Sequence, residues 1–531
     1  MTRFLVLLTL TGCASTPAAP PRPKPLAFPP NAMTVNERTT HALNRLAFGP
    51  SSSERQRIEG MGLERWVSEQ LVPGEDPAMS ERLSGFKTLN LSVAEAFREY
   101  PRPQQKLKAA GIDVKTEEGK AQAKAMAKEN PDEQPRQLIL ELTQAKLLRA
   151  ANSKRQLEEV MVDFWFNHFN VSAEKNRVRW MVNAYEREAI RPHVFGRFRE
   201  LLGATAKHPA MLWYLDNWMS VRDGFTLPAR KRDVADDDEP RVMGLNENYA
   251  RELLELHTVG VNAGYTQQDV REAARALTGW GVEIRQRQKD FGQFEFHPQA
   301  HDDGAKSVFG LTLPAGLGRD DGARLLDFLA RHPATAKHLA TKLCQRLVSD
   351  SPSPELVDRV AAVFLSTDGD LPSTYRAIVE SPEFWSSVGT KTRTPFEFVV
   401  ASVRAVGTLD EAKLPLAAAL EVLGQPLYRC APPTGYREDA AAWISAGALV
   451  SRINFGLRLA TGRVPGVVVQ LPSKDTSVER IAEQVLGRPA SPATLATVTR
   501  ALGSDDSLDE RRLDVSKVVG LLLGSPEFQK Q

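Results

Sequence analysis

Cysteine is scarce in this chain of 531 residues, which contains Cys13, Cys344 and Cys430 and no others. No two of them form a CxxC or CxxCH pattern, so the sequence indicates neither a cysteine-based metal site nor a site for haem attachment. Cys344 lies in the apolar register of a predicted helix. Cys344 and Cys430 could pair in an oxidising compartment, or both could be buried thiols, and the sequence leaves the two alternatives open.

A charge excess is also missing, because the net charge is only +2. This balance gives no reason to expect binding to nucleic acid. The sequence contains no HExxH, GxSxG, P-loop or dinucleotide-binding fingerprint. The usual signatures of hydrolases, kinases and dehydrogenases are therefore absent.

The N-terminus contains an apolar run, Phe4 to Leu10, that is far too short to span a bilayer. It follows the basic Arg3 and precedes Gly12-Cys13, and residues 1–13 resemble a bacterial lipoprotein signal in which the cysteine is lipidated. The following Ala-Ser pair lacks the aspartate that resembles an inner-membrane retention signal. We therefore expect a lipoprotein anchored through Cys13 in the outer membrane, facing the periplasm or the cell surface.

Residues 14–33 are rich in proline and alanine and cannot bury a core. They predict an extended tether between the anchor and a folded body. From residue 34 to residue 529 helical periodicity dominates, so the sequence predicts a mainly α, multi-helical body. The length allows two lobes, about 34–315 and 316–529.

Two local patterns interrupt or repeat within this helical body. Around residues 280–314 the periodicity changes to alternation of aromatic and β-branched residues, which predicts a small antiparallel β-meander of three strands. Ser-Pro-Glu-Phe occurs at residues 381–384 and again at 525–528, each time after an apolar helix. Serine favours the N-cap and proline the first helical position, so both copies predict a helix start.

Several longer segments occur in a fixed order along the body. They are FWFNHFNV (164–171), HPAMLWYLDN (208–217), NENYARELLELHTVG (246–260), HDDGAKSVFG (301–310) and LLLGSPEFQ (521–529). Together they resemble the bacterial domain-of-unknown-function family numbered 1800, over roughly residues 34–529.

This resemblance implies an exported bacterial protein without an established activity. Genes of the family often adjoin one for an exported protein similar to sulfatases or alkaline phosphatases, so the resemblance implies such a protein as a partner. Many members have a second histidine where this chain has Phe166. That departure weakens the case for two metal ligands in this segment.

Two histidines are predicted to face the core from the last turns of their helices. His168 shares a stripe with Leu157, Met161 and Phe164, and His257 lies in the middle of an apolar arc. Glu252 lies on the opposite arc of the second helix, so it is poorly placed to share a metal with His257.

One hypothesis joins these histidines to His301 and Asp302, which lie in a loop beside the predicted strands. His168, His257, His301 and Asp302 would hold a divalent transition metal such as zinc, whose bound water would be the nucleophile. Glu252 or Asp303 could then act as the base. The other candidates, chosen because they lie close in sequence, are Lys306 for catalysis and Asn167 and Trp280 for binding.

The alternative is that each histidine is a core residue whose ring is satisfied by a carbonyl and by aromatic packing. Two classes of function remain. The favoured class is a non-catalytic envelope protein, a helical scaffold or binding partner of the co-exported sulfatase- or phosphatase-like protein. The other is a metal-dependent hydrolase that acts on an envelope or extracellular polymer.

Overall fold

A computed structural model describes residues 25–226, 244–283, 291–503 and 514–531. The lipoprotein-type signal, Cys13 and the first part of the tether lie outside the described residues. Within the described part, none of the helices combines the length and apolar character needed to cross a membrane. Cys344 and Cys430 are both buried free thiols, so the structure contains no disulfide between them.

The described chain is mainly α-helical, as the periodicity predicts. The helices of the first half are α1 (Val35–Leu46), α2 (Ser52–Met61), α3 (Leu63–Gln70), α4 (Pro77–Leu83), α5 (Val93–Glu99), α6 (Pro103–Ala109), α7 (Glu117–Glu129), α8 (Arg136–Asn152), α9 (Gln156–His168), α10 (Val182–Ala184), α11 (Phe198–Lys207), α12 (Pro209–Tyr214), α13 (Asn248–Glu252) and α14 (Gln267–Leu277). Those of the second half are α15 (Asp320–Ala330), α16 (Pro333–Leu347), α17 (Pro354–Ser366), α18 (Leu371–Val379), α19 (Pro382–Ser386), α20 (Pro395–Val406), α21 (Leu414–Val422), α22 (Ala446–Ala460), α23 (Val478–Leu486), α24 (Pro492–Gly503), α25 (Val515–Gly524) and α26 (Pro526–Gln529).

Antiparallel strands occur near residues 280–314, where they are predicted, but they form two hairpins rather than one three-stranded sheet. Strands β1 (Trp280–Val282) and β2 (Phe294–Phe296) pair with each other, and β3 (Lys306–Val308) pairs with β4 (Leu311–Leu313). Residues 306–314, which alternation predicts as one strand, therefore fold back on themselves at Phe309-Gly310, where both residues have positive φ. A further pair that the sequence analysis missed joins β5 (Gly407–Leu409) to β6 (Val467–Val469).

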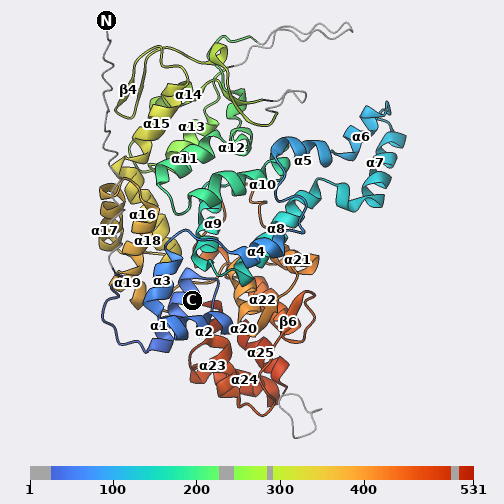
Figure 1. Ribbon diagram of the computed structural model, residues 1–531, viewed down its shortest axis with the longest axis vertical. Helices are drawn as coiled ribbons and strands as arrows, with labels where there is room; N and C mark the ends of the chain where they lie inside the picture. Colours follow the sequence, from blue (N-terminus) through green and yellow to red (C-terminus); the bar gives the residue numbers. More distant parts are fainter. Residues whose placement is uncertain (1–24, 227–243, 284–290, 504–513) are drawn as a thin grey trace, which may run out of the picture.

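Both Ser-Pro-Glu-Phe copies start a helix, which confirms the prediction. The Ser381 hydroxyl accepts a hydrogen bond from the Phe384 amide at 3.2 Å, and Ser525 caps α26 through the Phe528 amide at the same distance. The first copy also holds the N-terminal helix in place, because His41 of α1 donates to the carbonyl of Phe384 at 2.7 Å. Two segments distant in sequence, α1 and α19, are thereby joined. Helix α1 also lies beside the C-terminal helices, where the Thr40 hydroxyl donates to the carbonyl of Gly487 after α23 at 2.9 Å (Figure 1).

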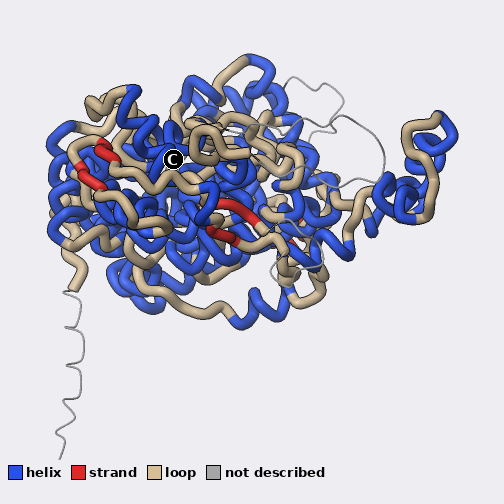
Figure 2. Tube along the Cα trace, turned by 90° about the horizontal axis from the view of Figure 1, so that it is seen from above, coloured by secondary structure: helices blue, strands red, loops and turns tan. Residues whose placement is uncertain are grey.

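The body buries one continuous hydrophobic cluster whose members lie on both sides of residue 315. Helices α11 and α14 of the first half pack against α15 of the second, and α8 packs against α20. Helices α6 and α7 project from the body as an arm in both views (Figures 1 and 2). The two predicted lobes thus share a core, in which α9 is central and carries His168.

Candidate functional site

His168 is the last residue of α9 and is almost fully buried. Its ring packs edge-on against Trp165 and Phe169, with centroids 5.2 and 4.5 Å away. Its Nε2–H donates to the backbone oxygen of His257 at 3.2 Å. Burial, followed by the charge of Lys342, lowers the pKa of His168 well below its usual value, so the ring is neutral at pH 7.

His257 ends a short π-helix, η6 (Leu253–His257), which continues α13. Helical periodicity predicts one regular helix over residues 246–260, and a regular helix does not describe the positions of side chains in this π-helical turn. The prediction that His257 is buried is nevertheless confirmed, because only 1% of the residue is exposed. Burial lowers its pKa to about 3. Glu252, the last residue of α13, is partly exposed, and burial raises its pKa.

A third histidine, His338 of α16, completes this cluster and was missed by the sequence analysis. Its Nε2–H donates to the carbonyl of Leu256 at 3.1 Å, next to the His257 carbonyl that accepts from His168. His168 and His338 therefore satisfy two successive carbonyls at the end of η6, where the helix leaves acceptors without intrahelical partners. This arrangement gives both histidines a structural role, and their ring centroids are 6.2 Å apart.

A cavity of about 170 Å³ opens beside this cluster. Its lining residues are Phe164, Asn167, His168, Lys342, Gln345, Asp350, Thr434, Tyr436, Arg437, Glu438 and Asp439. Asn167, predicted as a binding residue, fixes one wall: its amide nitrogen donates to the carbonyl of Tyr436 at 2.8 Å, and its oxygen accepts from the Tyr436 amide at 2.7 Å. Of the predicted site residues, the cavity brings His168 and Asn167 together.

His301 belongs to a different cluster. Its Nδ1–H donates to the Thr278 carbonyl at 2.8 Å, and its Nε2 lies 3.1 Å from a carboxylate oxygen of Asp321. Lys306, predicted as catalytic, forms an ion pair with the same oxygen at 2.6 Å, and the lysine and aspartate side chains are at most 1% exposed. Neither His168 nor His257 is among the hydrogen-bonding or ring contacts of His301.

Asp302, the fourth predicted ligand, accepts two hydrogen bonds of 2.7 and 3.0 Å from Arg275 of α14. Asp303 is exposed and accepts from the Gly318 amide at 3.2 Å. Trp280 is fully buried against Gly322 at the start of α15, so it lines the core rather than a surface site.

The structure thus divides the predicted zinc ligands between two places. In the parts of the chain that the structure describes, no three His, Cys, Asp or Glu side chains are grouped so that they could hold a metal ion. The physical reason is that Asp302 pairs with Arg275 and His301 contacts Asp321. Closeness in sequence did not predict these contacts.

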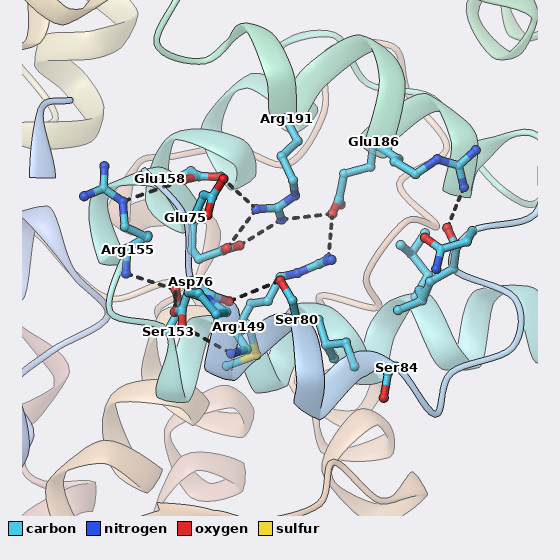
Figure 3. A pocket seen from close by; sticks show the side chains of 18 of the residues that line it. Glu75, Asp76, Ser80, Ser84, Arg149, Ser153, Arg155, Glu158, Glu186 and Arg191 are labelled. Atoms are coloured by element: carbon cyan, nitrogen blue, oxygen red, sulfur yellow. Dashed lines mark hydrogen bonds and ion pairs between the residues drawn. The ribbon is translucent and has the colours of Figure 1, made fainter. Parts of the chain in front are cut away.

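A charged recess of about 760 Å³ lies elsewhere, between α4 and the loop before it, helices α8 and α9 and the π-helix η3 (Tyr185–Ile190) (Figure 3). Arg191 is held in its wall by two hydrogen bonds to Glu159 of 2.8 and 2.9 Å and by Glu186 at 3.3 Å. Burial alone would lower the pKa of Arg191, but these carboxylates raise it. The inner charges are therefore paired with one another.

The rim of the recess is different. Glu75, Ser80 and Ser84 line it from the α4 side and are exposed (Figure 3). Glu158 lies across from them, and burial and the neighbouring Glu159 raise its pKa. Four arginines and five carboxylates line the recess, so its surface offers both signs of charge. These lining charges are Glu75, Asp76, Arg149, Arg155, Glu158, Glu159, Glu186, Arg187 and Arg191.

A family model described as protein of unknown function, DUF1800, matches residues 41–530. The chain belongs to the DUF1800 family. The match includes every residue of the cavity and the recess. Neither the curated proteins nor the solved structures contain a match to this DUF1800 chain.

Proposed function

We propose that this DUF1800 protein is a non-catalytic lipoprotein of the cell envelope, anchored through Cys13 in the outer membrane, that binds a co-exported sulfatase- or phosphatase-like protein. The observation that carries the proposal is the open recess of about 760 Å³ beside α4. Its walls are fixed by internal ion pairs and its rim presents exposed polar side chains, so it is formed before any partner arrives. A pre-formed, mixed-charge recess suits a polar segment of another protein.

The positions of two predicted catalytic residues, Lys306 and Asp303, and of the predicted metal ligand Asp302 support the same choice. Lys306 and Asp302 are used in ion pairs within the body, and Asp303 binds a backbone amide. These groups therefore stabilise the fold around the two hairpins. The binding class needs none of them for chemistry.

Binding can be tested with the purified chain and the exported sulfatase- or phosphatase-like protein encoded beside it. We expect calorimetric titration to detect binding, and Ser80→Arg on the rim to weaken it by about tenfold or more by filling the recess. Glu81→Arg is the matched control, because Glu81 is exposed on the same helix but does not line the recess. Equal affinities for the two variants would place binding outside the recess, and no binding by the unmodified chain would refute the proposed partner.

One observation favours the second candidate, a metal-dependent hydrolase. The Nδ1 atom of His168 and the Nε2 atom of His257 are buried and have no hydrogen-bond partner among the residues that the structure describes, and the two ring centroids lie 6.2 Å apart. Elemental analysis of the chain and of His257→Ala separates the two functions. The binding proposal predicts no stoichiometric transition metal in either protein, whereas one equivalent that is lost in the variant would establish the hydrolase candidate.

A further inference from the structure

Lys342 is a partly buried lysine beside the histidine cluster. It lies on α16 one turn after His338 and lines the 170 Å³ cavity. Its amine forms no hydrogen bond or ion pair with the residues that the structure describes, whereas Lys391 close by is bonded to Asp350 at 2.7 Å. Burial lowers the pKa of Lys342 to about 8, and the carboxylate of Glu438 opposes this shift only in part.

The groups that face this amine do not favour its charged form. His168, His257 and His338 each have a pKa lowered first by burial and also by the charge of Lys342. Near neutral pH they are uncharged rings, so they do not stabilise the ammonium, and Glu438 does so only while its carboxyl group is ionised. A substantial fraction of Lys342 is therefore a neutral amine under mildly alkaline conditions.

Glu438 lies in the wall of the same cavity. Burial raises its pKa, although Arg346 at 3.8 Å acts in the opposite direction. Its Oε2 atom is buried and has no hydrogen-bond partner in the described part of the chain. Glu438 and Lys342 line one hollow without forming an ion pair with each other, so a small molecule can lie between them.

We propose that this cavity binds a small aldehyde or ketone and that Lys342 forms an imine with it. An unprotonated lysine in a desolvated pocket is the form that attacks carbonyl carbons, and a carboxyl group with a raised pKa can supply the proton that this reaction needs. The cavity is smaller than the pockets of about 300 Å³ or more that hold drug-sized ligands, so the carbonyl compound has to be small.

The step is balanced without a further reactant. The lone pair of Lys342 Nζ forms a bond to the carbonyl carbon, and one amine proton moves to the carbonyl oxygen to give a carbinolamine. Glu438 then protonates the hydroxyl group, the C–O bond breaks and water leaves. The remaining N–H proton returns to the Glu438 carboxylate, which leaves a neutral imine and one water molecule.

The proposal does not depend on partner binding, because the cavity and the recess share no lining residue. It can be tested on the full chain with pyruvate and glycolaldehyde as probes and cyanoborohydride to reduce any imine. Peptide mass spectrometry then locates the modified lysines. Lys337 provides an internal control, since it lies on the same helix, is 63% exposed and is paired with Asp358.

We expect Lys342 to be modified about tenfold faster than Lys337 at pH 8 despite its burial, with a rate that rises through a midpoint of about 8. Lys342→Arg should abolish this fast modification, Lys337→Arg should leave it unchanged, and Glu438→Gln should slow it. The distribution of modified lysines and the pH midpoint are measured on the chain without substitutions, so they test the proposal even if a variant folds poorly. Modification of Lys342 no faster than that of Lys337, or a midpoint near that of a free lysine, would overturn the proposal.

Discussion

Asp321→Ala is expected to lower the free energy of unfolding by about 3–5 kcal/mol. Asp321 is the counter-ion of Lys306, whose side chain is fully buried, and the same carboxylate oxygen lies 3.1 Å from Nε2 of His301. Removing the carboxylate leaves a buried ammonium group without compensation. The midpoint of chemical unfolding, followed by circular dichroism, measures the effect.

Asp320→Ala is the matched control for this prediction. Asp320 precedes Asp321 in the first turn of α15 but is exposed, so its loss should cost less than about 1 kcal/mol. Adding Lys306→Met to Asp321→Ala should restore part of the stability, because both charges are then gone. If Asp321→Ala is as mild as Asp320→Ala, the cluster does not stabilise the fold and its lysine is free for another role.

Arg346→Met should be similarly destabilising, by about 3–5 kcal/mol. Arg346 on α16 is buried and faces three carboxylates: it is paired with Glu397 of α20, and Glu438 and Asp163 lie 3.8 and 3.9 Å away. Its loss leaves these acids without their shared cation. The matched control is Arg331→Met, whose exposed pair with Asp368 is worth at most about 1 kcal/mol.

The same network predicts a dependence on pH. Burial acts to raise the pKa of Glu397, but Arg346 and a hydrogen bond from the Thr394 amide hold it at about 2, below the ordinary value of 4.5. A carboxyl whose folded pKa is depressed stabilises the protein above its unfolded pKa. This contribution is therefore full above about pH 5 and is lost as the pH falls toward 2. In Arg346→Met the acid-induced loss should be smaller, and an unchanged acid profile would contradict the assignment to Glu397.

Much of the fold could be predicted because the relevant signals are local. Helical periodicity, the two Ser-Pro-Glu-Phe starts and the change to alternation near residue 280 each depend on residues within one or two turns. The start of α14 is equally local: the Thr266 side chain accepts from the Asp269 amide, and the Asp269 side chain accepts from the Thr266 amide. Burial of His168 and His257 followed from the same periodicity.

The candidate site could be predicted only in part, since it depends on contacts between distant segments. The π-helical turn that ends at His257 depends on His168 and His338, whose Nε2–H groups donate to the carbonyls of His257 and Leu256. These partners are 89 and 82 residues apart in sequence. His338 and Lys342 did carry a signal, because they are four residues apart on one helix. No local pattern predicts that Lys342 and Glu438 line one cavity, or that Asp302 pairs with Arg275.

Hydrogen exchange can show whether the co-exported protein binds in the recess beside α4. Backbone amides are compared in the free chain and in the presence of a saturating amount of the sulfatase- or phosphatase-like protein. We expect the amides of residues 74–90, which include α4 and the rim residues Ser80 and Ser84, to exchange more slowly in the bound chain than in the free chain. Exchange that is unchanged in residues 74–90 while the partner is bound would contradict binding in the recess.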